Sequence, residues 1–121
     1  MNVSPRRAGT AILVALVTGG SVAGVAAAAT KLSINAANGK IAFTKKSATA
    51  KAGKVTIVMK NPSSLPHAIA IKGHGVNVKG KVVTKGGTST VTATLKKGKY
   101  EFYCPVKGHE AAGMKGTLTV K

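Results

Sequence analysis

From residue 31 to the end of the chain, short runs of alternating apolar and polar residues are separated by turn residues. Alternation with a period of two is typical of strands that bury one face, and no run has the period of about 3.6 residues that marks an amphipathic helix. Short strands at intervals of roughly 10 residues are typical of β-sandwiches. The sequence therefore predicts an all-β sandwich of about eight strands.

The alternating runs also give the expected bounds of the strands. The first two runs are joined through Asn38-Gly39, a dipeptide typical of hairpin turns. Glycines, or the pair Asn61-Pro62, end most of the others. The expected strands cover residues 31–35, 40–44, 54–60, 67–72, 82–84, 89–95, 99–104 and 116–120.

The N-terminus has the pattern of a secretory signal peptide. Arg6 and Arg7 precede a stretch without charge from Ala8 to Thr30, and this stretch includes the small residues AAAA at 26–29. A basic start, an apolar centre and a small-residue end predict cleavage near Ala29.

We therefore expect residues 1–29 to be a signal peptide and residues 30–121 to be a mature domain, exported to the periplasm or to the cell surface. The alternative is an uncleaved membrane anchor, because the uncharged stretch is long enough to span about 30 Å of hydrocarbon. Several glycines make this stretch only modestly apolar, which favours cleavage.

The mature part is strongly basic. The net charge of +17 becomes +15 when Arg6 and Arg7 are removed, and Glu101 and Glu110 are the only acids. An excess of lysine is typical of proteins that bind nucleic acid, anionic membranes or acidic proteins. Here the lysines are spread along the chain and aromatic residues for base stacking are few, so we expect no nucleic-acid binding. Acidic protein partners are expected, peripheral contact with an anionic membrane surface stays open, and we expect a monomer.

The single cysteine, Cys104, is informative in an exported chain, because exported proteins normally use cysteines in disulfide pairs. It is a buried thiol, half of an intermolecular disulfide, or a metal ligand. Alternation over 99–104 points Cys104 inward at the end of its strand, and alternation over 67–72 points His67 inward at the start of another. If these strands are antiparallel neighbours, both residues lie at the same end of the sandwich.

Three potential metal ligands follow one another in a single loop, where Cys104, His109 and Met114 have the spacing C-x4-H-x4-M. A thiolate and a thioether suit Cu(I), and the imidazoles of His109 and His67 suit both oxidation states, so the set indicates a copper site for electron transfer. Zinc is the competing metal, but structural zinc sites usually contain cysteine pairs and gain little from a thioether. Taken singly, each of these residues would be an ordinary core or loop residue. His74 lies in a glycine loop and is expected to be exposed.

The segments KAGKVTIVMKN (51–61), NPSSLPHAIAI (61–71) and YEFYCPVKGHEAAGMKGTLTV (100–120) resemble the cupredoxin family of plastocyanin-like type I (blue) copper proteins. The resemblance covers Leu32 to Lys121. It implies a Greek-key β-sandwich with the metal at one end. It also implies one copper per chain, with equatorial ligands His67, Cys104 and His109 and the axial ligand Met114.

Two positions depart from the pattern of this family. Ala68 stands where an asparagine commonly follows the first histidine, and Pro105 stands where a hydroxyl residue often follows the cysteine. Because Pro105 has no N–H, the backbone N–H groups of Ala68 and Val106 are the expected donors to the sulfur.

The resemblance implies an electron carrier, and the residues argue against an enzyme. The neighbours of Cys104 are Tyr103 and Pro105, whereas a multicopper oxidase has histidines on both sides of its cysteine; one cysteine also excludes a binuclear copper centre. We expect an exported one-electron carrier between acidic redox partners such as cytochromes or a membrane oxidase. The alternatives are a copper-binding module for storage, delivery or tolerance, and a basic surface-binding protein without metal.

Overall fold

The computed structural model describes residues 28–121, and its secondary structure in this range is entirely β. The predicted signal peptide therefore lies outside the described residues, apart from Ala28 and Ala29, which begin the first strand. Within the described range there is no helix long and apolar enough to cross a membrane. The eight strands are β1 (Ala28–Ser33), β2 (Ser47–Ala50), β3 (Gly53–Asn61), β4 (Ala70–Gly73), β5 (Val76–Lys79), β6 (Gly87–Leu95), β7 (Gly98–Tyr103) and β8 (Lys115–Val120).

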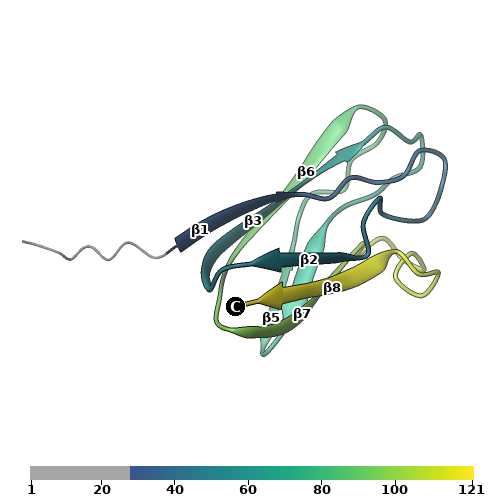
Figure 1. Cartoon of the computed structure of the whole chain (residues 1–121). Helices are drawn as coiled ribbons and strands as arrows, with labels where there is room; N and C mark the ends of the chain where they lie inside the picture. Colours follow the sequence, from purple (N-terminus) through teal and green to yellow (C-terminus); the bar gives the residue numbers. More distant parts are fainter. Residues whose placement is uncertain (1–27) are drawn as a thin grey trace, which may run out of the picture.

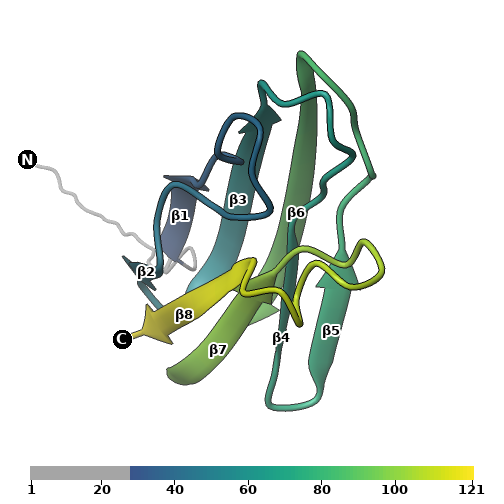
Figure 2. The ribbon, with the colours of Figure 1, turned by 90° about the vertical axis from the view of Figure 1, so that its right-hand side faces the viewer.

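The strands form two facing sheets, one with the order β1-β3-β6 and one with the order β2-β8-β7-β4-β5 (Figures 1 and 2). β1 runs parallel to β3 and β2 parallel to β8, while the remaining pairs are antiparallel. Strands that are distant in the sequence lie side by side, such as β3 with β6 and β4 with β7. The predicted all-β, Greek-key sandwich of eight strands is confirmed.

Five of the expected strands are present within a few residues of their predicted bounds, as β1, β3, β6, β7 and β8. The expected strand 67–72 begins later, at Ala70, because His67 instead makes an isolated antiparallel bridge to Val83. The expected strand 82–84 is reduced to that same bridge.

The prediction of a strand at 40–44 is wrong. The turn at Asn38-Gly39 does form, with Gly39 at a φ of 70° and Ala37 N–H donating to Ala42 O, but pairing ends at one bridge between Ala36 and Phe43. β2 and β5 were not expected, since each has only four residues and carries small or polar side chains among its apolar ones. Both lie at the edges of the larger sheet, where a strand pairs with only one neighbouring strand.

The core lies between the sheets and follows the predicted alternation. Inward residues of β3, β7 and β8 are almost fully buried, and the Phe102 ring lies 5.6 Å from that of Phe43. Burying a side chain of this size contributes about 1.5–3 kcal/mol relative to leaving it exposed. The main inward residues of these strands are Val55, Ile57, Met59, Tyr100, Phe102, Leu118 and Val120.

Tyr103 departs from this alternation. Alternation puts it on the face of β7 opposite Phe102 and Cys104, yet only 5% of its surface is accessible. The Lys72 ammonium lies 4.5 Å from the centre of its ring, and its hydroxyl donates to Asn77 Oδ1 at 2.7 Å. Side chains of β4 and β5 therefore cover the outer face of β7 at this point.

The antiparallel pairing of β4 with β7 decides where the predicted ligands meet. Ala70 is the register partner of Tyr103, so the residues just before β4 and just after β7 lie at the same end of the sheet. His67 and Cys104 occupy these two positions. The adjacency of their strands, on which the sequence prediction depended, is confirmed.

Candidate metal centre

Three potential ligands converge at this end of the sandwich. His67 Nδ1 and His109 Nδ1 are 3.2 Å apart, and Cys104 Sγ lies 3.9 Å from the first nitrogen and 3.5 Å from the second. All three atoms lie within 4.8 Å of one another. Nitrogen and sulfur ligands have these separations when each is roughly 2.0–2.3 Å from a shared ion, the range known for zinc.

The segment that leads from β3 to His67 is held by Asn61. Its amide donates to the carbonyls of Leu65 and Val83, each at 2.8 Å, and its carbonyl oxygen accepts the Ser63 N–H at 2.9 Å. His67 itself exchanges two backbone hydrogen bonds with Val83. In the sequence, Asn61 was visible only as part of a turn signal before proline.

The orientation of the His67 ring is set by a backbone carbonyl. His67 Nε2 is 3.1 Å from Lys40 O, and a carbonyl can only accept, so Nε2 carries the proton and Nδ1 is left with a free lone pair. Burial lowers the pKa of His67 below its ordinary value and the charge of His109 lowers it further, while the Lys40 contact raises it. A neutral imidazole with Nδ1 facing the cluster is the form that binds a metal. Sequence reasoning missed this role of Lys40, because a backbone atom carries it.

The Cys104 thiol is fully buried and lies close to two backbone N–H groups. Ala68 N–H donates to Sγ at 3.5 Å. Burial raises the pKa of the Cys104 thiol, and the N–H groups of Ala68 and Val106 act in the opposite direction. The prediction is confirmed for the Ala68 N–H, which donates to the sulfur.

The loop from Cys104 to Met114 is closed by its own backbone hydrogen bonds. Cys104 N–H donates to Met114 O and Met114 N–H to His109 O, both at 3.0 Å. Gly108 and Gly113 have φ values of 83° and 105°, in the region that favours glycine. These bonds fold the loop back so that His109 faces the start of β4.

The predicted site residues differ in burial. His67, Cys104 and Met114 are fully buried, whereas His109 is half-buried and is the member of the cluster on the solvent side. Met114 is part of the hydrophobic core at the point where the loop returns to β8. His74 lies apart from the cluster: it is exposed in the β4–β5 turn, as expected, with its ring 4.9 Å from that of Tyr100.

This donor set fits copper better than zinc. A thiol and two imidazoles converge in a largely buried position, and a buried thioether residue closes the same loop. Two histidines and one cysteine with a weak thioether form the donor set of a type I copper site.

Comparison with known proteins gives the family. A family model described as a cupredoxin-like domain matches residues 9–120. No curated protein sequence matches the chain.

Solved structures with the same fold include two auracyanins. The dithionite-reduced auracyanin of Roseiflexus castenholzii is 26% identical over 75% of this chain and 96% of its own, with a TM-score of 0.67. Auracyanin A, described as a "blue" copper protein of Chloroflexus aurantiacus, is 25% identical over 78% of this chain and 100% of its own, with a TM-score of 0.66.

Amicyanin from Paracoccus versutus is more distant, at 22% identity over 74% of this chain and 80% of its own, with a TM-score of 0.57, and supports the fold alone. The family match spans nearly the whole sandwich, including all the residues that converge at its end. The chain therefore belongs to the cupredoxin-like family.

Proposed function

We propose that the protein is an exported one-electron carrier that binds a single type I copper. The observation that carries this proposal is the convergence of two imidazole nitrogens and one thiol within 4.8 Å at the end of a cupredoxin sandwich. In this assignment His67, Cys104 and His109 are the equatorial ligands and Met114 is the axial one. The likeness to auracyanin A, a blue copper protein, supports the same metal.

Bound copper supplies one-electron chemistry, by cycling between Cu(I) and Cu(II). The protein contributes a site that changes little when the electron arrives. His67 is fixed by the Lys40 carbonyl and by its bridge to Val83, and Cys104 follows directly on β7. The buried side chains exclude water, while half-buried His109 gives a short route to the surface.

The proposed partners are acidic redox proteins, such as cytochromes or a membrane oxidase. This proposal rests on the net charge of +17, since Glu101 and Glu110 are the only acids of the chain. Export rests on the sequence of residues 1–29, with its basic start and small-residue end. We propose a carrier rather than an enzyme, with periplasm or cell surface as its location.

The test is a titration of the mature domain, residues 30–121, with Cu(II). We expect an intense visible charge-transfer band that saturates at about one equivalent, because a thiolate and two imidazoles surround the ion. The matched variant Cys104→Ser removes the thiolate and should remove the band. A strongly coloured Cys104→Ser variant would overturn the ligand assignment.

A second measurement separates the carrier from a copper storage, delivery or tolerance module. A carrier shows reversible one-electron voltammetry and retains its metal in both oxidation states. A delivery module loses copper to a modest chelator in one of the two states. Ready loss of copper from the reduced protein would favour delivery.

A further inference from the structure

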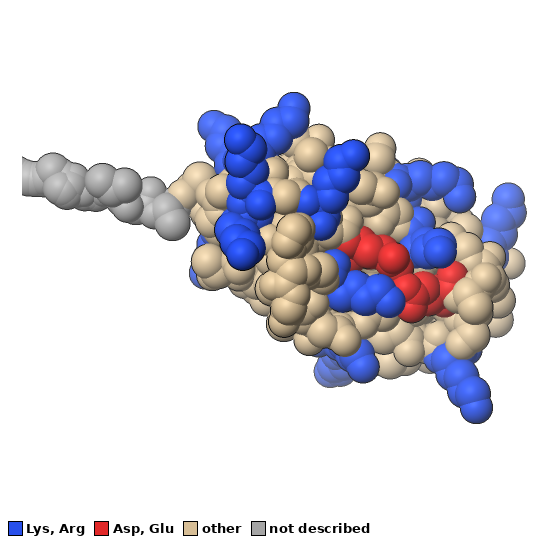
Figure 3. Space-filling view, turned by 90° about the horizontal axis from the view of Figure 1, so that it is seen from below, with Lys and Arg blue, Asp and Glu red and all other residues tan. Residues whose placement is uncertain are grey.

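Lys72 lies against both acidic residues of the chain. Its Nζ is 2.6 Å from Glu110 Oε2 and 4.0 Å from Glu101 Oε2. The two glutamates form one small acidic area among lysines on the molecular surface (Figure 3). Glu101 is the register partner of Lys72 on β7, whereas Glu110 belongs to the metal-binding loop and directly follows His109. The short contact of Lys72 therefore links β4 to that loop.

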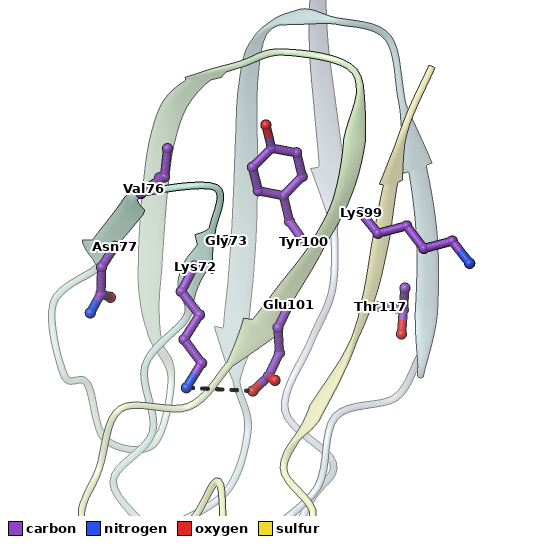
Figure 4. A pocket seen from close by; sticks show the side chains of 9 residues that line it. Lys72, Gly73, Val76, Asn77, Lys99, Tyr100, Glu101 and Thr117 are labelled. Atoms are coloured by element: carbon purple, nitrogen blue, oxygen red, sulfur yellow. Dashed lines mark ion pairs between the residues drawn. The ribbon is translucent and has the colours of Figure 1, made fainter.

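Residues of three strands surround the Lys72 side chain and set its orientation. It lies on β4 beside Glu101 of β7, and both side chains border the shallow hollow on the outer face of the larger sheet (Figure 4). The Lys72 ammonium also lies 4.5 Å from the Tyr103 ring centre, and the Tyr103 hydroxyl is bound to Asn77 of β5. Within residues 28–121 no side chain or backbone group donates to Glu101 Oε2, and burial, with Glu110 beside it, raises the pKa of Glu101. Glu110 is therefore the acid that Lys72 contacts directly.

The metal-binding loop, residues 104–114, makes few other polar contacts with the sheet in its middle part. Its backbone hydrogen bonds stay within the loop, from His109 to Val106, from Ala112 to Gly108 and from Gly113 to Glu110. Beneath it is a hollow of about 380 Å³, lined among others by Lys72, Tyr103 and Glu110.

Ala68 follows the predicted ligand His67, and Pro105 follows the predicted ligand Cys104. Neither residue can connect the loop to the sheet through a side-chain hydrogen bond. Ala68 and Pro105 have no hydrogen-bonding side chain. Among the described residues, and apart from the contacts of the cluster itself, the Lys72–Glu110 pair is the one ion pair from a loop side chain to the sheet. Glu101 lies beside the same Glu110 carboxylate, and burial together with this neighbour raises the pKa of Glu101.

We propose that Lys72, acting through Glu110, is a positioning residue for His109. The inference rests on the proposed copper function, because it makes the placement of a copper ligand depend on an ion pair outside the site. Glu110 is attached to the backbone next to His109, so holding its carboxylate against β4 restricts how far that backbone can move away from Cys104. Lys72 touches neither the metal nor its ligands.

The first test uses the apoprotein and a double-mutant cycle with Lys72→Met, Glu110→Gln and the combined variant. Methionine keeps the packing stem over Tyr103 and removes the charge. The readout is hydrogen exchange at the Ala112 and Met114 amides, which are bonded within the loop. We expect each single variant to raise exchange about two- to five-fold, the range for a partly exposed ion pair. The double variant should show no further increase, because both changes remove one interaction.

Two further variants serve as controls. Lys99→Met removes the same charge from an exposed lysine of β7 that has no ion-pair partner among residues 28–121, and should leave loop exchange unchanged. Lys72→Arg keeps the pair and should restore the wild-type rate. Equal effects of Lys72→Met and Lys99→Met, or additive effects of Lys72→Met and Glu110→Gln, would overturn the proposal.

The second test uses the copper-loaded protein and the rate at which a chelator removes Cu(I). We expect Lys72→Met to accelerate removal two- to five-fold, with Lys99→Met matching wild type. An unchanged rate in Lys72→Met would overturn the positioning role. If wild-type protein gives no blue band with Cu(II), the proposed function fails instead, and the apoprotein cycle still decides whether the pair holds the loop.

Discussion

At the residue scale, Cys104 combines full burial with a neighbourhood of backbone donors. Burial raises the pKa of its thiol, and the Ala68 and Val106 N–H groups only oppose this shift. Without metal, the neutral thiol is therefore the dominant form at neutral pH. A metal binds the thiolate, so binding and proton loss are coupled at this one atom.

The first prediction is that copper binding releases about one proton per chain at pH 7. His67 contributes none, because burial lowers its pKa and leaves it neutral. The proton count can be measured by titrating Cu(I) into weakly buffered apoprotein with a pH indicator. Cys104→Ser is the control and should release almost none. Binding to the wild-type protein without proton release would mean that the thiol is not a ligand.

The second prediction concerns Met114. Met114→Leu should raise the reduction potential and retain copper, because the thioether is a weak donor that stabilises Cu(II) more than leucine can. The two side chains have similar volume, so the cost to folding should stay below about 1.5 kcal/mol. Voltammetry and metal analysis of the same sample check both parts. Complete loss of copper would show that Met114 is a principal ligand.

The residues of the cluster could be predicted because their chemistry is specific and strand alternation fixes where side chains point. Cys104 and His67 are the clearest examples: period-two geometry placed both inward at strand ends. The Lys40 carbonyl could not be predicted, since a backbone acceptor leaves no trace in the residue type. The same alternation puts Tyr103 on the outer face of β7, but its burial there depends on Lys72 and Asn77 from other strands.

At the element scale, the connection from β3 to His67 matters most for the site. This segment contains no strand, and its shape depends on the buried Asn61 side chain, which is 1% exposed. One amide joins Leu65, Ser63 and Val83, and Val83 in turn is bridged to His67. Asn61 therefore links the end of the smaller sheet to a ligand of the proposed centre.

The third prediction is that Asn61→Ala lowers the free energy of unfolding by about 2–4 kcal/mol, because three hydrogen bonds are lost and their partners stay partly buried. Urea unfolding of the apoprotein measures this. The matched control is Asn35→Ala, which removes one hydrogen bond to Lys60 N–H and should cost about 1 kcal/mol. Equal losses in the two variants would contradict the linking role of Asn61.

Long central strands were predictable and short edge strands were not. β3 and β6 have nine residues each and alternate clearly, which makes them visible without tertiary information. β2 and β5 have four residues each, and their pairing depends on β8 and β4 being in place beside them. The error at 40–44 has the same origin, because its alternation is real but no neighbouring strand extends the bridge at Phe43.

At the scale of the whole molecule, charge is the dominant property. Nearly all lysines of residues 28–121 are exposed, and they are spread along this range. On the face that Figure 3 shows, lysines surround the two acids, which lie together around Lys72. The described part of the chain therefore presents positive potential in most directions. Such a field raises the rate of encounter with acidic partners without fixing one binding face.

The fourth prediction is that electron transfer to an acidic cytochrome slows as salt is added. The screening length falls from about 30 Å at 0.01 M ionic strength to about 8 Å at 0.15 M. We expect the second-order rate to fall roughly ten-fold or more over this range. Stopped-flow measurements provide the rate, with a small uncharged oxidant as the control. A rate that is constant or rises with salt would refute the acidic-partner proposal.

The contact between His67 and the Lys40 carbonyl has a consequence for mutagenesis. The Lys40 side chain is exposed, so replacing it leaves the carbonyl in place and the ring orientation intact. An alanine substitution of Lys40 should therefore leave the site unchanged. Deleting a residue from the 37–42 turn removes the acceptor instead. Loop-length variants, rather than side-chain substitutions, are the way to detect what this position does.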